Sequence, residues 1–253
     1  MRIRLLLLPL LLLFSVPVPG QDEEKIKQLF EDAIAAMGGA AYLKVTDIYT
    51  EGNYFLFNRD GDSSGLIKYN DWTKLPDKSR NELGNKKKLK DVTVFNLEKN
   101  EGWILEGQKD TRDAKPEEMK SFRDAVKHAI DNIFRYRWKD PKNKLFYLGP
   151  GEGREVQYDQ VQILDPENDT VTIYFDRIKK FPAKIEYKDV SQRGVNLRHV
   201  EEYDQWHPMG GLVVPLRIDH FVNGRKSSQL YVTSVQFNTS MPDSLFTKPI
   251  PPK

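Results

Sequence analysis

The sequence predicts an α+β fold in which one large curved antiparallel sheet, an incomplete β-barrel, wraps around two amphipathic helices. Two segments carry apolar residues at the spacing of a helical face, and a long series of short segments has the character of strands. Turn residues such as Asp60-Gly61 and Arg193-Gly194 separate most of these strands, and short connections favour antiparallel neighbours. Two helices cannot cover both faces of so large a sheet, which favours a sheet that curves around them.

The first twenty residues have the pattern of a secretory signal peptide. A short basic start leads into an apolar run from Leu5 to Phe14, and small residues follow as far as Gly20. The apolar run is short for a membrane-spanning helix, so an uncleaved anchor is the less favoured alternative. We therefore expect cleavage near Gly20/Gln21, a periplasmic or secreted location, and a single domain over residues 21–253.

The composition narrows the class of protein. The chain contains 39 basic and 37 acidic residues, and two of the basic ones lie in the signal peptide. A mature chain with almost no net charge has no overall attraction to nucleic acid. Cysteine is absent, so no disulfide framework supports the fold after export. Stability must come from a hydrophobic core, which a chain of this length can form.

The two helices are predicted at Asp22–Met37 and Pro116–Trp138. In the first helix apolar residues recur at positions i, i+3, i+4 and i+7. Gly38-Gly39 ends it, because glycine adopts the left-handed backbone of a helix stop. In the second helix Pro116 suits the first turn, and Pro141 prevents a longer helix.

Strands occupy most of the remaining chain. Phe181–Lys188 alternates apolar and polar residues, and Asn223-Gly224 between Leu212–Val222 and Leu230–Phe237 is a strong signal for a two-residue hairpin. A break at Gly149-Pro150-Gly151 is expected to divide the sheet into two halves of one domain. The other expected strands are Asp47–Phe57, Gly65–Trp72, Lys78–Leu83, Val92–Leu97, Gly102–Glu106, Glu155–Leu164, Thr170–Phe175 and Asn196–Trp206.

Several short motifs follow one another along nearly the whole mature chain. They are Met37-Gly38-Gly39, Tyr42-Leu43, Glu51-Gly52-Asn53, Trp72 with Pro76 and Arg80, Gly211-Leu212-Val213-Val214-Pro215, and Met241-Pro242-Asp243-Ser244-Leu245-Phe246 followed by Pro249. Their order resembles the LolA-like superfamily, which includes periplasmic outer-membrane lipoprotein-sorting proteins and their relatives. The resemblance implies an incomplete β-barrel whose open side is covered by helices and whose cavity shelters acyl chains.

A carrier of acyl chains must offer a dry cavity, because each exposed CH₂ group costs about 0.8 kcal/mol in water. The alternative for each residue expected in such a cavity is a place in the packed core. The resemblance also implies that Arg80 hydrogen-bonds a helical lid and keeps the cavity closed, with a solvated surface arginine as the alternative. The residues expected to line the cavity are Tyr54, Leu56, Ile67, Tyr69, Trp103, Phe175, Ile185, Tyr187, Val214 and Ile218.

The sequence offers little support for an enzyme. It contains no serine elbow, phosphate loop, zinc signature or calcium loop, and we expect no enzymatic activity, no metal and no cofactor. His199, Glu201 and Tyr203 would share one face of a strand, with His207 close behind. Such a group could hold a metal or transfer protons, so its role stays open. His220 continues an apolar face and is expected to be a core residue.

The expected function is that of an exported monomeric carrier, which binds acyl chains of lipoproteins or lipids between the sheet and the helical lid. Its expected partners are transport components of the inner and outer membranes. One alternative is an envelope scaffold that binds protein on the same fold without lipid. Another is a secreted hydrolase that uses His199 and Glu201. The basic run from Lys86 to Lys90 either contacts anionic lipid head groups or forms a solvated loop.

Overall fold

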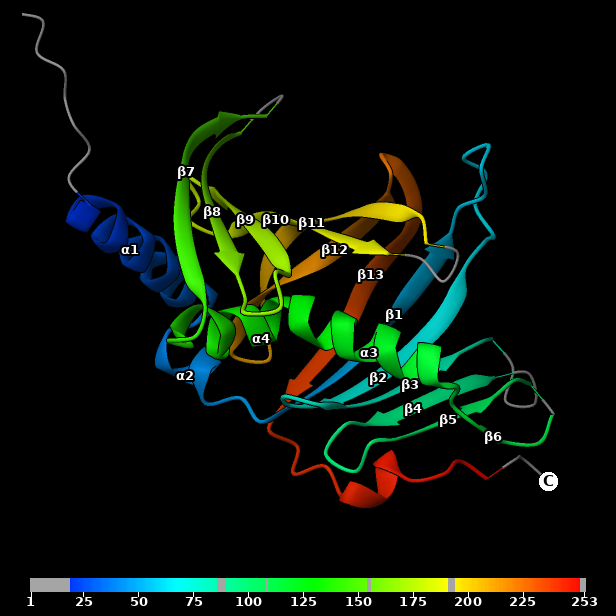
Figure 1. Ribbon diagram of the computed structural model, residues 1–253. Coiled ribbons are helices and arrows are strands. Elements are labelled where there is room, and N and C mark those ends of the chain that lie inside the picture. Colours follow the sequence, from blue (N-terminus) through cyan, green and yellow to red (C-terminus); the bar gives the residue numbers. More distant parts are fainter. Residues whose placement is uncertain (1–18, 86–89, 108, 154–155, 191–193, 251–253) are drawn as a thin grey trace, which may run out of the picture.

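The computed structural model describes residues 19–85, 90–107, 109–153, 156–190 and 194–250. This part of the chain forms a single sheet of 13 antiparallel strands, with helices inside the curve of the sheet (Figure 1). The predicted α+β class is therefore confirmed. Residues 1–18 of the predicted signal peptide and most of the basic run from Lys86 to Lys90 lie outside the described residues.

The sheet is one long meander that starts in its middle. The chain runs outward from β1 to one edge, crosses to the other edge, and returns strand by strand until β13 pairs with β1. The outward strands are β1 (Asp47–Leu56), β2 (Ile67–Lys74), β3 (Lys78–Leu83), β4 (Asp91–Asn96), β5 (Glu101–Leu105) and β6 (Arg112–Asp113). The returning strands are β7 (Lys144–Glu152), β8 (Gln157–Leu164), β9 (Thr170–Asp176), β10 (Pro182–Val190), β11 (Asn196–Met209), β12 (Leu212–Val222) and β13 (Arg225–Phe237).

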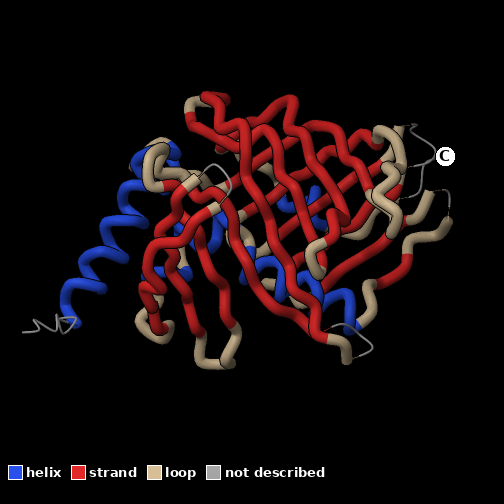
Figure 2. Tube along the Cα trace, turned by 90° about the horizontal axis from the view of Figure 1, so that it is seen from above, coloured by secondary structure: helices blue, strands red, loops and turns tan. Residues whose placement is uncertain are grey.

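The expected strands all have counterparts within a few residues, and the predicted hairpin is confirmed. Val222 pairs with Arg225, and the two residues between them have positive φ, 51° at Asn223 and 79° at Gly224. This is the backbone that an Asn-Gly turn supplies between twisted strands. Figure 2 shows the strands as one continuous sheet, with helix α1 (Pro19–Met37) at one end.

The strand β7 was not predicted, and the expected break at Gly149-Pro150-Gly151 was wrong. These residues lie inside β7, which pairs with β8 through a register shift between Tyr147 and Gly149. β7 is at the edge of the sheet, where proline is tolerated because one side of the strand needs no ladder hydrogen bonds. Because turn-forming residues lie inside this edge strand, its sequence did not predict a strand.

Helix α1 confirms the first predicted helix, and its apolar face forms the main core. Phe30 is fully buried, stacks on Trp138 with ring centroids 4.6 Å apart, and meets Phe175 edge to face. Full burial of such a side chain stabilises the fold by about 2–3 kcal/mol. A short helix α2 (Ala40–Leu43) follows the predicted glycine stop.

The second predicted helix starts at Pro116 as expected but is broken at Ala129. The break separates α3 (Pro116–His128) from α4 (Ile130–Arg135), and a 3₁₀ turn η2 (Arg137–Lys139) follows. Asn132 Nδ2 donates to the carbonyl of Val126 at 3.0 Å, and Arg137 donates to that of Lys127 at 3.2 Å. These side chains satisfy the carbonyls of Val126 and Lys127 near the break, where the helix no longer supplies all backbone partners.

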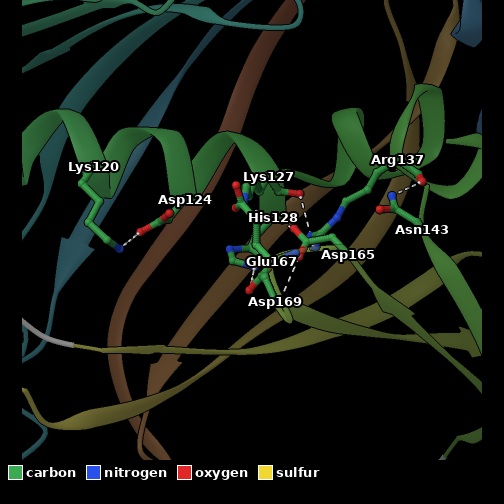
Figure 3. A network of polar contacts seen from close by, with 9 residues as sticks. All are labelled: Lys120, Asp124, Lys127, His128, Arg137, Asn143, Asp165, Glu167 and Asp169. Atoms are coloured by element: carbon green, nitrogen blue, oxygen red, sulfur yellow. Dashed lines mark hydrogen bonds and ion pairs between the residues drawn. The ribbon is translucent and has the colours of Figure 1, made fainter.

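A polar network ties the end of α3 to the turn between β8 and β9 (Figure 3). His128 Nε2 lies 3.0 Å from Asp169 Oδ2, and Arg137 donates to the same oxygen at 2.6 Å. Lys127 pairs with Asp165 at 3.3 Å on the same turn. Burial raises the pKa of Asp169, but the hydrogen bond and charge of His128, together with the charge of Arg137, outweigh it and lower that pKa to about 2.

A second, smaller core lies on the convex face of the sheet. The segment after β13 folds back under β3 and β4 and contains the 3₁₀ turn η3 (Asp243–Phe246). Its Met241 and Phe246 pack against Val94 and Leu105, all four being buried. The C-terminal segment therefore covers part of the sheet that the helices do not.

We predict that Asp169→Asn lowers the free energy of unfolding by about 2 kcal/mol at pH 7, because His128 and Arg137 lose a charged partner. The pKa of Asp169 lies below its ordinary value, so its contribution is complete above about pH 4 and is lost as the pH falls through about 2. Urea unfolding at pH 7 and pH 2.5 measures both effects. Glu167→Gln, on the exposed side of the same turn, is the control, and equal losses for the two variants would contradict the prediction.

Candidate functional site

An apolar cavity of about 250 Å³ lies between the middle of the sheet and the helices. The sheet supplies its floor from β1, β2, β12 and β13, and the helices supply its roof from the end of α1, from α2 and from the start of α4. Its wall residues are Met37, Tyr42, Ile48, Thr50, Tyr69, Asp71, Asn81, Ile130, Asp131, Trp206, Leu212, Val213, Val214, Pro215, Ile218, Leu230, Val232, Val235 and Phe237.

One side of the cavity wall is polar. Thr50, Asp71 and Asn81 stand opposite one another on β1, β2 and β3 and therefore share a face of the sheet. The Asp71 carboxylate accepts from Thr73 Oγ1 at 2.9 Å and from Asn81 Nδ2 at 3.4 Å. Burial raises the pKa of Asp71, and these hydrogen bonds oppose the rise.

A second cavity of about 270 Å³ adjoins the first beneath α3. The two share Ile48, Thr50, Asp71 and Asp131 as lining residues, and Ala129, where the helix breaks, lines the second. Asp131 is held on the roof by an ion pair with Arg135 and by the hydroxyl of Tyr42. The two cavities therefore adjoin, and we refer to them together as the groove between the sheet and the helices.

Solved structures with the same architecture are known. A DUF1329 family protein from Desulfovibrio piger has a TM-score of 0.60 at 10% identity, with 88% of this chain and 97% of that one covered. A LolA superfamily protein from Nitrosomonas europaea has a TM-score of 0.57 at 13% identity and the same coverage. A putative outer membrane lipoprotein-sorting protein domain from Vibrio parahaemolyticus has a TM-score of 0.52 at 12% identity, with 90% and 97% covered.

The chain has a LolA-like fold. This agrees with the resemblance seen in the sequence motifs. No family model matches the sequence, and no curated protein matches it in sequence. Among the described residues, no helix is long and apolar enough to cross a membrane.

Three of the ten residues expected in the cavity line it in the LolA-like fold. They are Tyr69 on β2 and Val214 and Ile218 on β12. Tyr54 on β1 pairs with Ile67 on β2 and with Leu230 on β13. Leu230 lines the cavity, whereas Tyr54 and Ile67 lie beyond the end of the cavity. Leu56, on the same face of β1, is 44% exposed.

The other expected cavity residues belong to packed regions. Phe175 and Ile185 are buried in the main core under α1 and α4. Tyr187 stacks on His128, with ring centroids 3.9 Å apart. Trp103 packs in the smaller core on the convex face.

Arg80 also lies on the convex face, in one cross-strand row with Trp72 and Trp103. Its guanidinium donates to Glu82 at 2.6 Å and to the carbonyl of Leu245 at 3.3 Å. It therefore holds the C-terminal segment, on the side of the sheet opposite the cavity.

Several wall residues were not singled out from the sequence. Leu230 and Val232 alternate on β13, and Val235 and Phe237 follow the bulge near Thr233 that restores them to the cavity face. The alternation was visible, but no sequence signal showed that a helix would fail to fill the space above it. Met37 and Ile130 lie on the apolar faces of the predicted helices and Tyr42 in a motif of the resemblance, and none of the three was predicted to line a cavity.

The histidine group on β11 and β12 forms a stacked row. His199 Nδ1 lies 3.1 Å from His220 Nε2, and the His199 ring stacks on Tyr187. Glu201 accepts from Tyr203 at 2.9 Å, and its burial raises its pKa. His207 is exposed further along β11. Among the described residues there is no group of three or more His, Cys, Asp or Glu side chains that could hold a metal ion.

The pKa of His220 predicts acid sensitivity. Burial, with His199 beside it, lowers this pKa to about 4, so the folded state binds a proton less readily than the unfolded chain. The contribution of neutral His220 to the unfolding free energy is therefore complete above about pH 6.5 and is lost as the pH drops toward 4. The unfolding free energy of the parent protein should fall between pH 7 and pH 4.5. We predict that this fall is smaller by about 1–2 kcal/mol in His220→Gln, as measured by urea unfolding. The control is His207→Gln, and identical pH slopes for both variants would contradict the assignment.

Proposed function

We propose that this protein is an exported periplasmic carrier that shelters acyl chains of lipoproteins or lipids in the groove under its helices, without enzymatic activity. The observation that carries the proposal is the apolar cavity of about 250 Å³ between an open sheet and a helical roof. The LolA-like fold supports it, since one solved structure with this fold is named as a putative lipoprotein-sorting domain. The N-terminal pattern of a signal peptide supports export.

The energetics suit reversible binding. A chain of ten methylene groups gains about 8 kcal/mol when it leaves water, before the costs of ordering and association are subtracted. The first cavity is slightly smaller than the range of about 300–1,000 Å³ usual for small-ligand sites, and the adjoining cavity extends it. One chain of this length fits the scale of the groove, and a larger cargo would require the roof to move.

The roof over the cavity consists of short elements. α2 and α4 are short, and the break at Ala129 separates α4 from α3. A larger cargo would require Ile130 and Asp131 to move away from the cavity, because both line it. Arg80 holds the C-terminal segment on the other face, so we assign it no part in this opening.

Transport components of the inner and outer membranes would deliver and accept the cargo of a monomeric carrier.

The second candidate function is a protein-binding scaffold, and the edge strand β7 is the observation that favours it. β7 exposes Phe146 and Leu148 and has no partner strand on its outer side in the described chain. Such an edge can accept an added strand from another protein.

We predict that protein expressed with residues 21–253 in a bacterial periplasm, and purified without detergent, carries acyl lipid or lipopeptide near one equivalent per chain. Mass spectrometry of the denatured sample measures it. A well-folded protein that carries no lipid and ignores added fatty-acyl probes would contradict the carrier and leave the scaffold.

We predict that Val232→Phe weakens binding of an acyl probe at least tenfold, because the larger ring occupies the cavity. The unfolding free energy should stay the same or rise by about 0.5–2 kcal/mol, as for other cavity-filling changes. Fluorescence titration and urea unfolding measure the two effects. Val190→Phe, at a position 57% exposed on β10, is the matched control. Unchanged binding in Val232→Phe would contradict the location of the site.

A further inference from the structure

The hydroxyl of Tyr69 is a buried polar group without a partner. Tyr69 lines the cavity and is 3% exposed, and its hydroxyl makes no hydrogen bond within the described residues. Its ring lies across Gly52 on β1, where a Cβ would stand 2.5 Å from the ring and 2.8 Å from the hydroxyl. The glycine therefore makes room for the ring, and the unpaired hydroxyl costs the empty protein stability.

The charged side chains that line the first cavity, Asp71 and Asp131, are both acidic. Asp71, two residues along the same face of β2, bonds only to uncharged Thr73 and Asn81 among the described residues. Asp131 is neutralised by Arg135. The described lining of the first cavity contains no lysine, arginine or histidine, and Lys78, which lines the adjoining cavity, pairs with Glu98 at 2.6 Å. A ligand with a carboxylate would therefore meet Asp71 without any compensating cation.

We infer that the cavity binds a neutral acyl compound whose hydroxyl or carbonyl oxygen accepts a hydrogen bond from Tyr69, and that it discriminates against the anion of a free fatty acid. This inference rests on the proposed carrier function and adds the chemistry of the ligand's polar end. An alcohol fits, because its oxygen can accept from the Tyr69 hydroxyl and the group adds no charge to the cavity. Esters and amides fit through their carbonyl oxygens.

A cationic end fits less well than a neutral one. An ammonium group would find Asp71, but it would have to leave water for a cavity whose wall is otherwise mostly apolar. The Asp71 carboxylate already accepts two hydrogen bonds, from Thr73 and Asn81. The unpaired Tyr69 hydroxyl would gain no acceptor from an ammonium group.

The test compares three probes with the same chain: dodecanol, dodecanoate and dodecylammonium, titrated into the delipidated protein at pH 7.5. Dodecanol should bind at least tenfold more tightly than dodecanoate. Tyr69→Phe should weaken dodecanol about tenfold, the value of one hydrogen bond. Asp71→Asn should tighten dodecanoate and so reduce the discrimination. Tyr49→Phe is the matched control, because the Tyr49 hydroxyl bonds to Glu51 on the convex face and should not affect any probe.

The same variants check the folded state. Removing an unpaired buried hydroxyl should leave the thermal midpoint of Tyr69→Phe unchanged or higher, whereas a hydroxyl bonded inside the protein would lower it. If Tyr69→Phe does not fold, the hydroxyl is structural and the inference is overturned. Asp71→Asn then reports independently on the charge.

The outcomes separate the inference from the carrier function. Equal affinity for dodecanol and dodecanoate, with no effect of Tyr69→Phe, overturns the inference and leaves an unselective carrier. Tightest binding of dodecylammonium overturns the neutral assignment in favour of a pair with Asp71. Binding of none of the three probes, in a folded protein, overturns the carrier and the inference together.

Discussion

The helical crossover between the two edges of the sheet is the constraint on which the rest of the structure depends. The chain leaves the sheet at β6 and re-enters it at β7, and between them lie α3, α4 and η2. In the described chain these edge strands do not pair with each other, so the sheet curves without closing. A closed barrel would bury its own interior. This open one needs helices to cover its concave face.

The helices fill the space over the concave face of the sheet unevenly, and the candidate site lies where that space is left unfilled. At one end Phe30, Trp138 and Phe175 fill the space between α1 and the sheet completely. In the middle, the break at Ala129 and the shortness of α2 and α4 leave the groove unfilled. The network of His128, Arg137 and Asp169 fastens α3 at the margin of this groove, so the roof is fixed on one side and short on the other (Figure 3).

The sequence could predict most of the fold because periodicity reports local structure. It located α1, the start of α3 and every central strand, but β7 was hidden by Gly149-Pro150-Gly151 at an edge where proline is tolerated. Alternation identifies the two faces of a strand without saying which face a helix covers. Trp103 was therefore expected in the cavity, and the resemblance implied that Arg80 holds a helical lid, whereas the C-terminal segment covers the face on which both residues lie. Periodicity also cannot distinguish a filled core from a cavity. Ile185 and Ile218 both lie in alternating strands, but Ile185 is buried in the main core and Ile218 lines the cavity.

The positions of the tryptophans allow the most direct measurement. Trp206 lines the cavity, whereas Trp72 and Trp103 pack on the convex face and Trp138 lies in the main core. An acyl probe brominated near the end of its chain quenches tryptophan only on close approach. If the groove takes the chain, the probe will quench emission saturably in the parent protein, and Trp206→Phe will abolish most of that quenching while Trp72→Phe leaves it intact. Equal quenching in all three proteins, or none, would contradict a ligand cavity between the sheet and its helices.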